Sequence, residues 1–141
     1  MASEARLYTF SPETTAQLRK FKLSTSRDSK PKARIYVIDK NTLEIKQEGG
    51  ETFTSLEELS GELPENSPRF VLLSHPVVLK SGRASTPYVM LYYMPVTADH
   101  KMRMIYAGAK ELFRNTADAS KILDVVDEDE VAAVEETLVA G

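Results

Sequence analysis

The sequence of 141 residues predicts a single α+β domain spanning residues 1–141, in which helices cover both faces of a mostly antiparallel, mixed sheet of about five strands. Two patterns predict this three-layer architecture. Apolar residues recur at helical spacing over residues 97–114. Short runs rich in β-branched and aromatic residues recur between turn signals elsewhere. The segments follow in the order α-β-β-α-β-β-α-β-α, for which a sheet between two helical layers is the economical arrangement.

The chain begins with residues 1–10, which we expect to form a flexible arm. Ser11, Pro12 and Glu13 then mark a helix start, because serine caps, proline suits the first helical position and glutamate favours the positive end of the helix dipole. This helix should run to about Lys22. Its narrow buried stripe is expected to consist of Thr14, Leu18 and Phe21.

Two strands follow the first helix. Residues 33–39 are apolar on both faces, which is typical of a strand inside a sheet that is covered on both sides. Residues 42–48 alternate, with Leu43 and Ile45 directed inward. The turn between the two segments predicts a β-hairpin.

The middle of the chain alternates between turns and buried strands. Ser55, with Glu58 three residues later, fits a capping box for a short helix. Residues 69–74 and 87–94 are continuous apolar runs typical of buried strands. Residues 77–85 contain a turn between two strands.

The long helix over residues 97–114, for which Thr97 is the expected cap, carries two anomalies. Met104 is an apolar residue on a face that should be solvated. Gly108 lies in mid-helix, where glycine costs about 1 kcal/mol relative to alanine. Together they indicate that this helix buries one side and offers the other to a protein partner.

The end of the chain predicts one more strand and one more helix. Residues 122–126 form the strand, and Asp127, with Glu130 three residues later, caps the helix. Its buried face is expected to contain Val131, Val134 and Leu138.

Composition excludes several classes of function. Hydrophobic residues make up 42% and charged residues 28%, as in globular proteins. The chain contains no cysteine, no apolar run near the ~20 residues of a membrane span, and no signal peptide at residues 1–10. These features predict a cytoplasmic protein without stable membrane association. The net charge of −3 argues against general nucleic-acid binding.

No residue pattern predicts catalysis or a cofactor. The two histidines, His75 and His100, have no carboxylate pair at ligand spacing, so we expect no metal site. No serine lies in a nucleophile elbow, and Gly49-Gly50 lacks the context of a phosphate loop. We therefore expect a binding module rather than an enzyme.

Charge is distributed unevenly along the chain. Residues 19–40 contain eight basic and two acidic residues, whereas the segment from Asp118 onward is acidic. Such runs are usually solvated faces. The alternative is that they steer an oppositely charged partner.

Four segments resemble the actin-depolymerising-factor homology family, which includes cofilin. Residues 101–110, KMRMIYAGAK, resemble the principal binding helix of that family. Residues 18–22, 62–70 and 82–87 resemble its basic first helix, a loop into a strand, and a turn. All four occur in order and at the expected spacing. Within the family, the segments are most similar to the glia maturation factors.

This resemblance implies a gelsolin-like fold and a function in the actin cytoskeleton. Glia maturation factors bind the actin-related protein 2/3 complex, inhibit branched nucleation and promote debranching. The resemblance thus implies two partners, this complex and actin at the branch junction. It also implies a monomer, no cofactor, and a location on branched actin networks. Alternatives are a cofilin-like protein that binds and severs filaments, and a small enzyme or lipid-headgroup binder that uses the basic patch.

The resemblance also implies two partner-binding surfaces. The first would dock on an actin-related subunit and comprises Ala2, Ser3, Glu4, Lys101, Arg103, Met104, Gly108 and Glu111. The second would touch actin in the daughter branch and comprises Arg19, Lys20, Lys22, Gly82 and Arg83. Ser3 resembles the amino-terminal phosphorylation position of the family, where a phosphate beside Glu4 would add negative charge to the docking arm.

Overall fold

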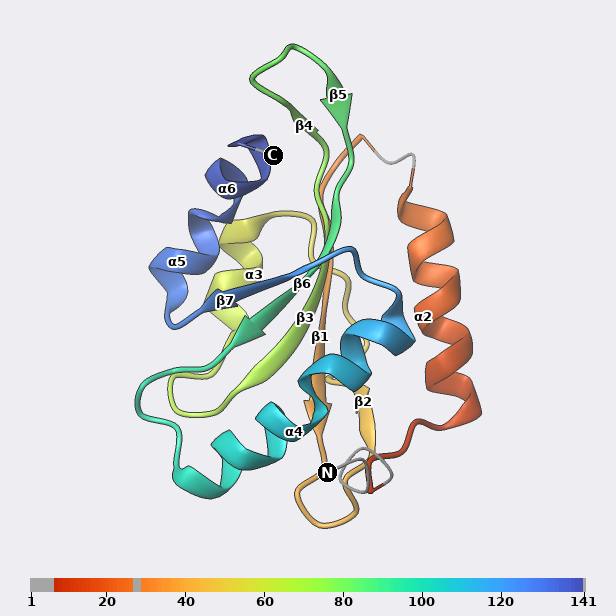
Figure 1. The fold of residues 1–141 in the computed structure, drawn as a ribbon, viewed down its shortest axis with the longest axis vertical. Coiled ribbons are helices and arrows are strands. Elements are labelled where there is room, and N and C mark those ends of the chain that lie inside the picture. The colour runs from red at the N-terminus through yellow and green to blue at the C-terminus, as the bar shows by residue number, and fades with distance from the viewer. Residues whose placement is uncertain (1–6, 27–28, 141) are drawn as a thin grey trace.

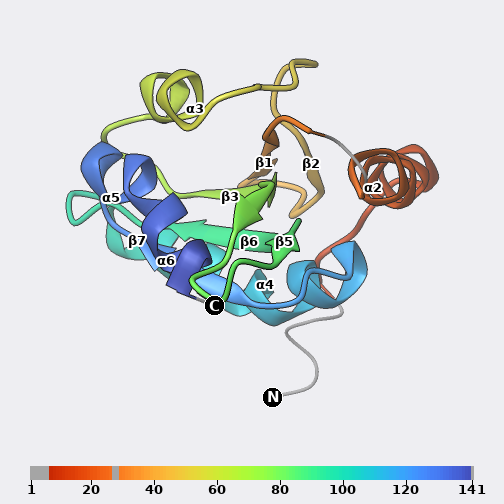
Figure 2. The ribbon, with the colours of Figure 1, turned by 90° about the horizontal axis from the view of Figure 1, so that it is seen from above.

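The computed structural model describes residues 7–26 and 29–140, which form three layers with a sheet in the middle (Figures 1 and 2). The sheet has five strands in the order β2-β1-β3-β6-β7, so the mixed sheet that the sequence predicts is confirmed. The strands are β1 (Lys32–Ile38), β2 (Ile45–Gln47), β3 (Arg69–Ser74), β6 (Tyr88–Tyr93) and β7 (Ile122–Val125).

Neighbouring strands are antiparallel except β6 and β7, which are parallel. The register places Val71 of β3 opposite Ile35 of β1 and Leu91 of β6. A separate two-stranded sheet, β4 (Val77–Val78) and β5 (Ala84–Ser85), forms the hairpin at the upper end of the molecule in Figure 1.

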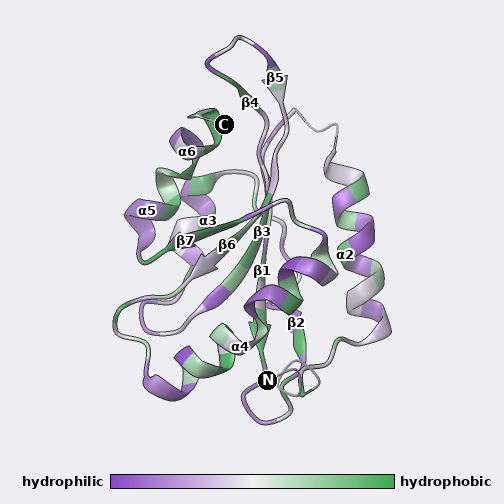
Figure 3. Cartoon of the chain, viewed as in Figure 1, coloured by the Kyte–Doolittle hydropathy of each residue, from purple (hydrophilic) through white to green (hydrophobic). Residues whose placement is uncertain are grey.

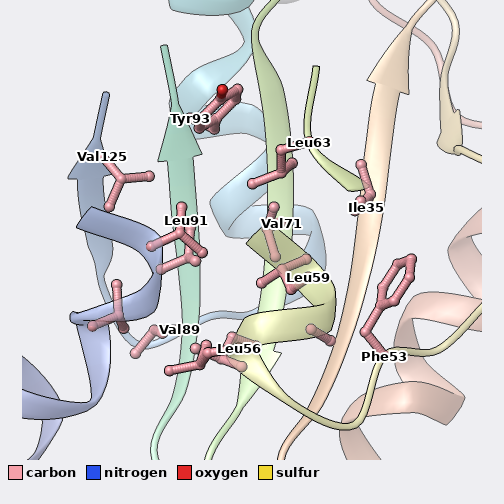
Figure 4. Packing of buried hydrophobic residues seen from close by; sticks show 14 of the residues in the cluster. Ile35, Phe53, Leu56, Leu59, Leu63, Val71, Val89, Leu91, Tyr93 and Val125 are labelled. Carbon is pink, nitrogen blue, oxygen red and sulfur yellow. The ribbon is translucent and has the colours of Figure 1, made fainter. Parts of the chain in front are cut away.

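One face of the sheet is covered by α3 (Leu56–Glu62), α5 (Glu128–Ala132) and α6 (Val134–Ala140). Figure 4 shows Leu56 and Leu59 of α3 packed over Val71 and Leu91 of the strands. Leu59, Val71 and Leu91 have no exposed surface. Complete burial of such a side chain contributes roughly 1.5–3 kcal/mol, so apolar packing in this layer stabilises the sheet.

The other face is covered by α2 (Pro12–Thr25) and α4 (His100–Ala117). Hydrophobic and hydrophilic residues alternate along both helices, as one-sided burial requires (Figure 3). Phe113 of α4 stacks on Phe70 of β3 with ring centroids 4.8 Å apart. The N–H of Ile38 donates to the hydroxyl of Tyr106 at 2.9 Å, which fixes α4 across the sheet.

Three helix starts that the sequence predicts are confirmed, and one is wrong. Ser11, Ser55 and Asp127 accept the expected backbone N–H three residues on. Thr97 does not cap α4. Asp99 does so by accepting the N–H of Met102 at 2.8 Å, while the Thr97 hydroxyl donates to the carbonyl of Glu65.

Other boundaries also differ from the sequence prediction. The long helix continues to Ala117 and ends at Asp118, which adopts the left-handed conformation. The predicted last helix is divided at Ala133 into α5 and α6. The strand expected over residues 42–48 spans only Ile45–Gln47, because Leu43 has a positive φ of 61°.

The beginning of the chain is partly ordered by contacts with the domain. Residues 1–6 of the expected arm lie outside the described residues. Thr9 forms a parallel bridge with Glu44, and Phe10 stacks on Phe113 at 6.4 Å. Residues 8–10 therefore pack on the fold, in contrast to the flexible arm expected for residues 1–10.

Candidate functional site

The outer stripe of α4 brings together four residues of the first surface. Lys101, Met104, Gly108 and Glu111 are spaced by three or four residues, so they share one side of the helix. Lys101 and Glu111 are exposed, and the Met104 side chain is 62% exposed. Exposed large apolar side chains with a charged border are a common feature of protein interfaces.

A groove beside this stripe extends its apolar character. It has a volume of about 480 Å³ and lies between Met104, Leu7, Tyr8 and Leu43. Leu7 is 60% exposed. The sequence prediction did not include Leu7, Tyr8 or Leu43 in the site. The only signal in the sequence was the apolar content of residues 7–10, in a segment expected to be an arm.

Gly108 leaves room for the Tyr8 side chain of the same chain. The hydroxyl of Tyr8 donates to the carbonyl of Ile105 at 2.7 Å and passes over Gly108. A Cβ at Gly108 would lie 2.5 Å from this hydroxyl oxygen, which is closer than such atoms approach. The glycine therefore has a structural cause, and the resulting Tyr8–α4 contact forms one wall of the apolar groove.

Arg103 lies off the outer stripe and is half-buried. Its Nη2 donates to the carbonyls of Pro95 at 2.9 Å and Val96 at 2.8 Å, and its Nε donates to the carbonyl of Ala98 at 3.1 Å. The guanidinium thus holds the loop that precedes α4. This loop presents Val96, which is 77% exposed.

In the second surface, Arg19 and Lys20 are exposed on α2 and form no ion pair with the described residues. Lys22 differs, because its amine binds both the carboxylate and the backbone carbonyl of Asp118. The hydrogen bond and the charge of Lys22 hold the pKa of the Asp118 carboxyl below its ordinary value. The Lys22 amine is therefore engaged by its own domain, whereas Arg19 and Lys20 keep charges that no described residue pairs with.

The hairpin residues of the second surface lie at a turn. Gly82 has a φ of 89°, which glycine adopts without strain, and its N–H donates to the carbonyl of Leu79 at 2.8 Å. Arg83 is exposed. Figure 1 shows this hairpin at one end of the molecule and the first turn of α4 at the other, so the hairpin part of the second surface is well separated from the first turn of α4.

Ala2, Ser3 and Glu4 lie outside the described residues, so their place in the first surface stays a prediction. Within residues 7–26 and 29–140, no three His, Cys, Asp or Glu side chains are grouped so that they could hold a metal ion. In the same part of the chain, no helix combines the length and apolar character needed to cross a membrane.

Comparisons with known proteins agree on one family. The model of the family described as cofilin/tropomyosin-type actin-binding protein matches residues 7–138. Protein AIM7 of Saccharomyces cerevisiae is 35% identical over 128 residues, which are 86% of each chain. Human glia maturation factor beta is 33% identical over 113 residues, covering 77% of this chain and 75% of its own. The solution structure of glia maturation factor from Caenorhabditis elegans has a TM-score of 0.73 and 30% identity, covering 88% of each chain.

Proposed function

The chain belongs to the family of cofilin/tropomyosin-type actin-binding proteins, and from this membership we propose that it regulates branched actin networks by binding the actin-related protein 2/3 complex. In this proposal it inhibits nucleation of new branches and promotes the release of existing ones. It acts on branched networks in the cytoplasm, as a monomer, by binding and without catalysis.

The choice of this complex over the filament is supported by the pattern of similarity. Human glia maturation factor beta and its Caenorhabditis elegans counterpart are 33% and 30% identical to this chain. By contrast, a solved Plasmodium berghei actin depolymerization factor is 20% identical at a TM-score of 0.75, which establishes a shared fold only. A second candidate function, filament binding and severing, is favoured by that shared fold and by the actin-binding description of the matched family.

The observation that carries the proposal is the exposed Met104 beside the groove formed with Leu7 and Leu43. We propose that Met104 enters an apolar cleft on an actin-related subunit, with Lys101 pairing with a carboxylate at the border. A central apolar anchor with a charged rim is the usual energetic arrangement of an interface. Arg103 contributes by holding the loop before α4, because its Nε and Nη2 are already bound to carbonyls of that loop.

The second surface is proposed to touch actin in the daughter branch. Arg19 and Lys20 are its accessible charges on α2, and Arg83 is its charge on the hairpin. A basic surface suits acidic actin through charge complementarity.

No covalent step is needed for branch release. If the protein binds the complex more tightly in its inactive conformation than in its branch-holding one, binding alone shifts the population and weakens the junction. A shift of the equilibrium by a factor of ten requires about 1.4 kcal/mol of differential binding free energy. Phosphorylation of Ser3 remains a prediction. Ser3→Glu should weaken binding, and equal affinity would reject this regulation.

The decisive experiment compares two partners under the same conditions. Co-sedimentation with pure actin filaments measures filament binding, and a pull-down with purified actin-related protein 2/3 complex measures complex binding. We expect strong retention by the complex and weak co-sedimentation. Strong filament binding without complex binding would reject the proposal in favour of severing.

A further inference from the structure

We infer that the outer edge of β2 is a docking site for an extended peptide segment of another protein. The segment would add to the sheet in the groove between β2 and α2, and would place a carboxylate against Lys20 and Arg34. Both ribbon views show α2 running beside β2 at this edge of the sheet (Figures 1 and 2). This inference goes beyond the proposed function. The groove shares Lys20 with the second surface, but neither proposed surface includes the edge of β2.

The outer edge of β2 already pairs with one residue of the same chain, Thr9. The N–H of Thr9 donates to the carbonyl of Leu43 at 3.1 Å, and the N–H of Ile45 donates to the carbonyl of Thr9 at 2.8 Å. These two bonds form a parallel bridge. The backbone at this edge is therefore accessible and has the geometry that strand addition requires.

The chain leaves this edge directly after the bridge. The carbonyl of Ser11 accepts the N–H of Thr15 inside α2, so it is directed into the helix rather than toward β2. Pro12 has no N–H to donate. The start of α2 thus interrupts a strand that would otherwise continue along β2.

The next residues of β2 present unused backbone groups to the groove. The N–H of Glu48 donates to the carbonyl of Ile35, so the backbone of Glu48 faces β1. Because backbone direction alternates along a strand, the N–H and carbonyl of Gln47 face the opposite way. Within the described part of the chain, β2 is one of the two edge strands of this sheet, and no strand pairs with Gln47 on its outer side.

The groove has room for a segment of several residues. Its volume is about 670 Å³, against about 480 Å³ for the groove beside Met104. Gln17 and Phe21 of α2 form one wall. Gly49 and Gly50, which follow β2, also line it, and their absent side chains leave the backbone open.

The charged side chains in the part of the groove beyond the Thr9 bridge indicate the chemistry of the occupant. Lys20 and Arg34 line it, and neither forms an ion pair with another described residue. The Arg34 guanidinium lies 4.4 Å from the ring centroid of Phe21, which holds it at the wall. The acidic residues of the groove, Glu13 and Glu44, belong to the start of α2 and to the bridge with Thr9. An acidic extended segment fits best.

The test uses random ten-residue peptides displayed on phage and selected on the intact protein. Selected peptides should be acidic and should bind through their backbone. N-methylation of one alternating set of peptide amides should lower affinity at least tenfold, while methylation of the other set should leave it within about threefold. Nuclear magnetic resonance should show a shift of the Gln47 amide signal on binding.

Variants of the protein locate the site. Gln47→Pro removes the outward N–H and should lower affinity at least tenfold, whereas Gln47→Ala, which keeps this N–H, should leave it within about twofold. Lys20→Glu should also lower affinity about tenfold, and Lys40→Glu, an exposed charge reversal outside the groove, should not. A melting temperature close to that of the parent confirms that each variant is folded.

Three results would overturn the inference. The first is a library that yields no binder. The second is a set of binders that bind Gln47→Pro as tightly as the parent. The third is a dimer in sedimentation equilibrium that Gln47→Pro dissociates, since the occupant of the edge would then be a second copy of this chain.

Discussion

The hydroxyl of Tyr8 passes over Gly108 and donates to the carbonyl of Ile105, so a residue that precedes α2 requires a glycine in the middle of α4. The two residues are 100 positions apart in the sequence. Their contact explains a helix-weakening glycine without a partner protein, and it also builds the wall of the groove beside Met104.

The contact predicts that Tyr8 and Gly108 are energetically coupled. Tyr8→Phe should lower the free energy of unfolding by about 1 kcal/mol, the typical loss of one hydrogen bond. Gly108→Ala alone should be nearly neutral, because a gain in helix propensity of about 1 kcal/mol is offset by displacement of the Tyr8 hydroxyl. In the Tyr8→Phe background the hydrogen bond is already absent, so Gly108→Ala should become stabilising. Urea denaturation of the four proteins measures the coupling, and simple additivity would contradict it.

The predictions from sequence succeeded where the signal is local. The caps at Ser11, Ser55 and Asp127 are set by residues three apart, and the buried strands by continuous apolar runs. The predictions failed where a distant residue decides. The Thr97 hydroxyl binds the carbonyl of Glu65 rather than the start of α4, and Tyr8 bonds to α4 across 97 positions.

The same limit applies to the candidate site. The exposure of Lys101 and Met104 followed from helical periodicity, because their positions on the helix surface are fixed by spacing. Helical periodicity did not predict that the Arg103 and Lys22 side chains bind groups of their own domain. A long cationic side chain can bind loop carbonyls or a carboxylate that come near it only after folding.

The different environments of Arg103 and Lys101 predict different effects of their removal. Arg103→Ala removes three hydrogen bonds to carbonyls of the loop before α4, so it should lower the free energy of unfolding by about 1–3 kcal/mol and increase amide exchange in that loop. Lys101→Ala should change stability by less than about 0.5 kcal/mol and should weaken binding to the complex. Equal stability of the two variants would show that Arg103 does not hold the loop.

Met104 should contribute far more to binding than to stability. Because its side chain is 62% exposed, Met104→Ala should alter the free energy of unfolding by less than about 0.5 kcal/mol. If the side chain is the apolar anchor, binding to the complex should fall at least tenfold, or about 1.4 kcal/mol. Val126→Ala, at a 41% exposed site outside both proposed surfaces, serves as the control. Equal binding by both variants would remove Met104 from the interface.

The Lys22–Asp118 pair predicts a pH dependence at acid pH. Lys22 lowers the pKa of the Asp118 carboxyl in the folded protein. The stabilisation is therefore present above the ordinary carboxyl pKa of about 3.9 and is lost as pH falls through the lower folded value. Titration of the Asp118 carboxyl by nuclear magnetic resonance should give a higher pKa in Lys22→Met than in the parent. Identical titration curves would contradict the pairing.

Tyr88 carries a buried hydroxyl that has no hydrogen-bond partner among the described residues. Burial raises the pKa of this phenol above its ordinary value of about 10. The ionisation of Tyr88 therefore leaves the free energy of unfolding unchanged below pH ~10 and lowers it as pH rises further, because the phenol ionises first in the unfolded chain. Tyr88→Phe keeps the ring against Phe21 and should raise the free energy of unfolding at neutral pH by about 1 kcal/mol. It should also reduce the fall in stability above pH 10.

Tyr93→Phe is the matched control, because the Tyr93 hydroxyl donates to the carbonyl of Pro64 at 2.7 Å and its removal should destabilise the protein at neutral pH. Destabilisation by Tyr88→Phe to the same extent as Tyr93→Phe would show that the Tyr88 hydroxyl is satisfied in solution.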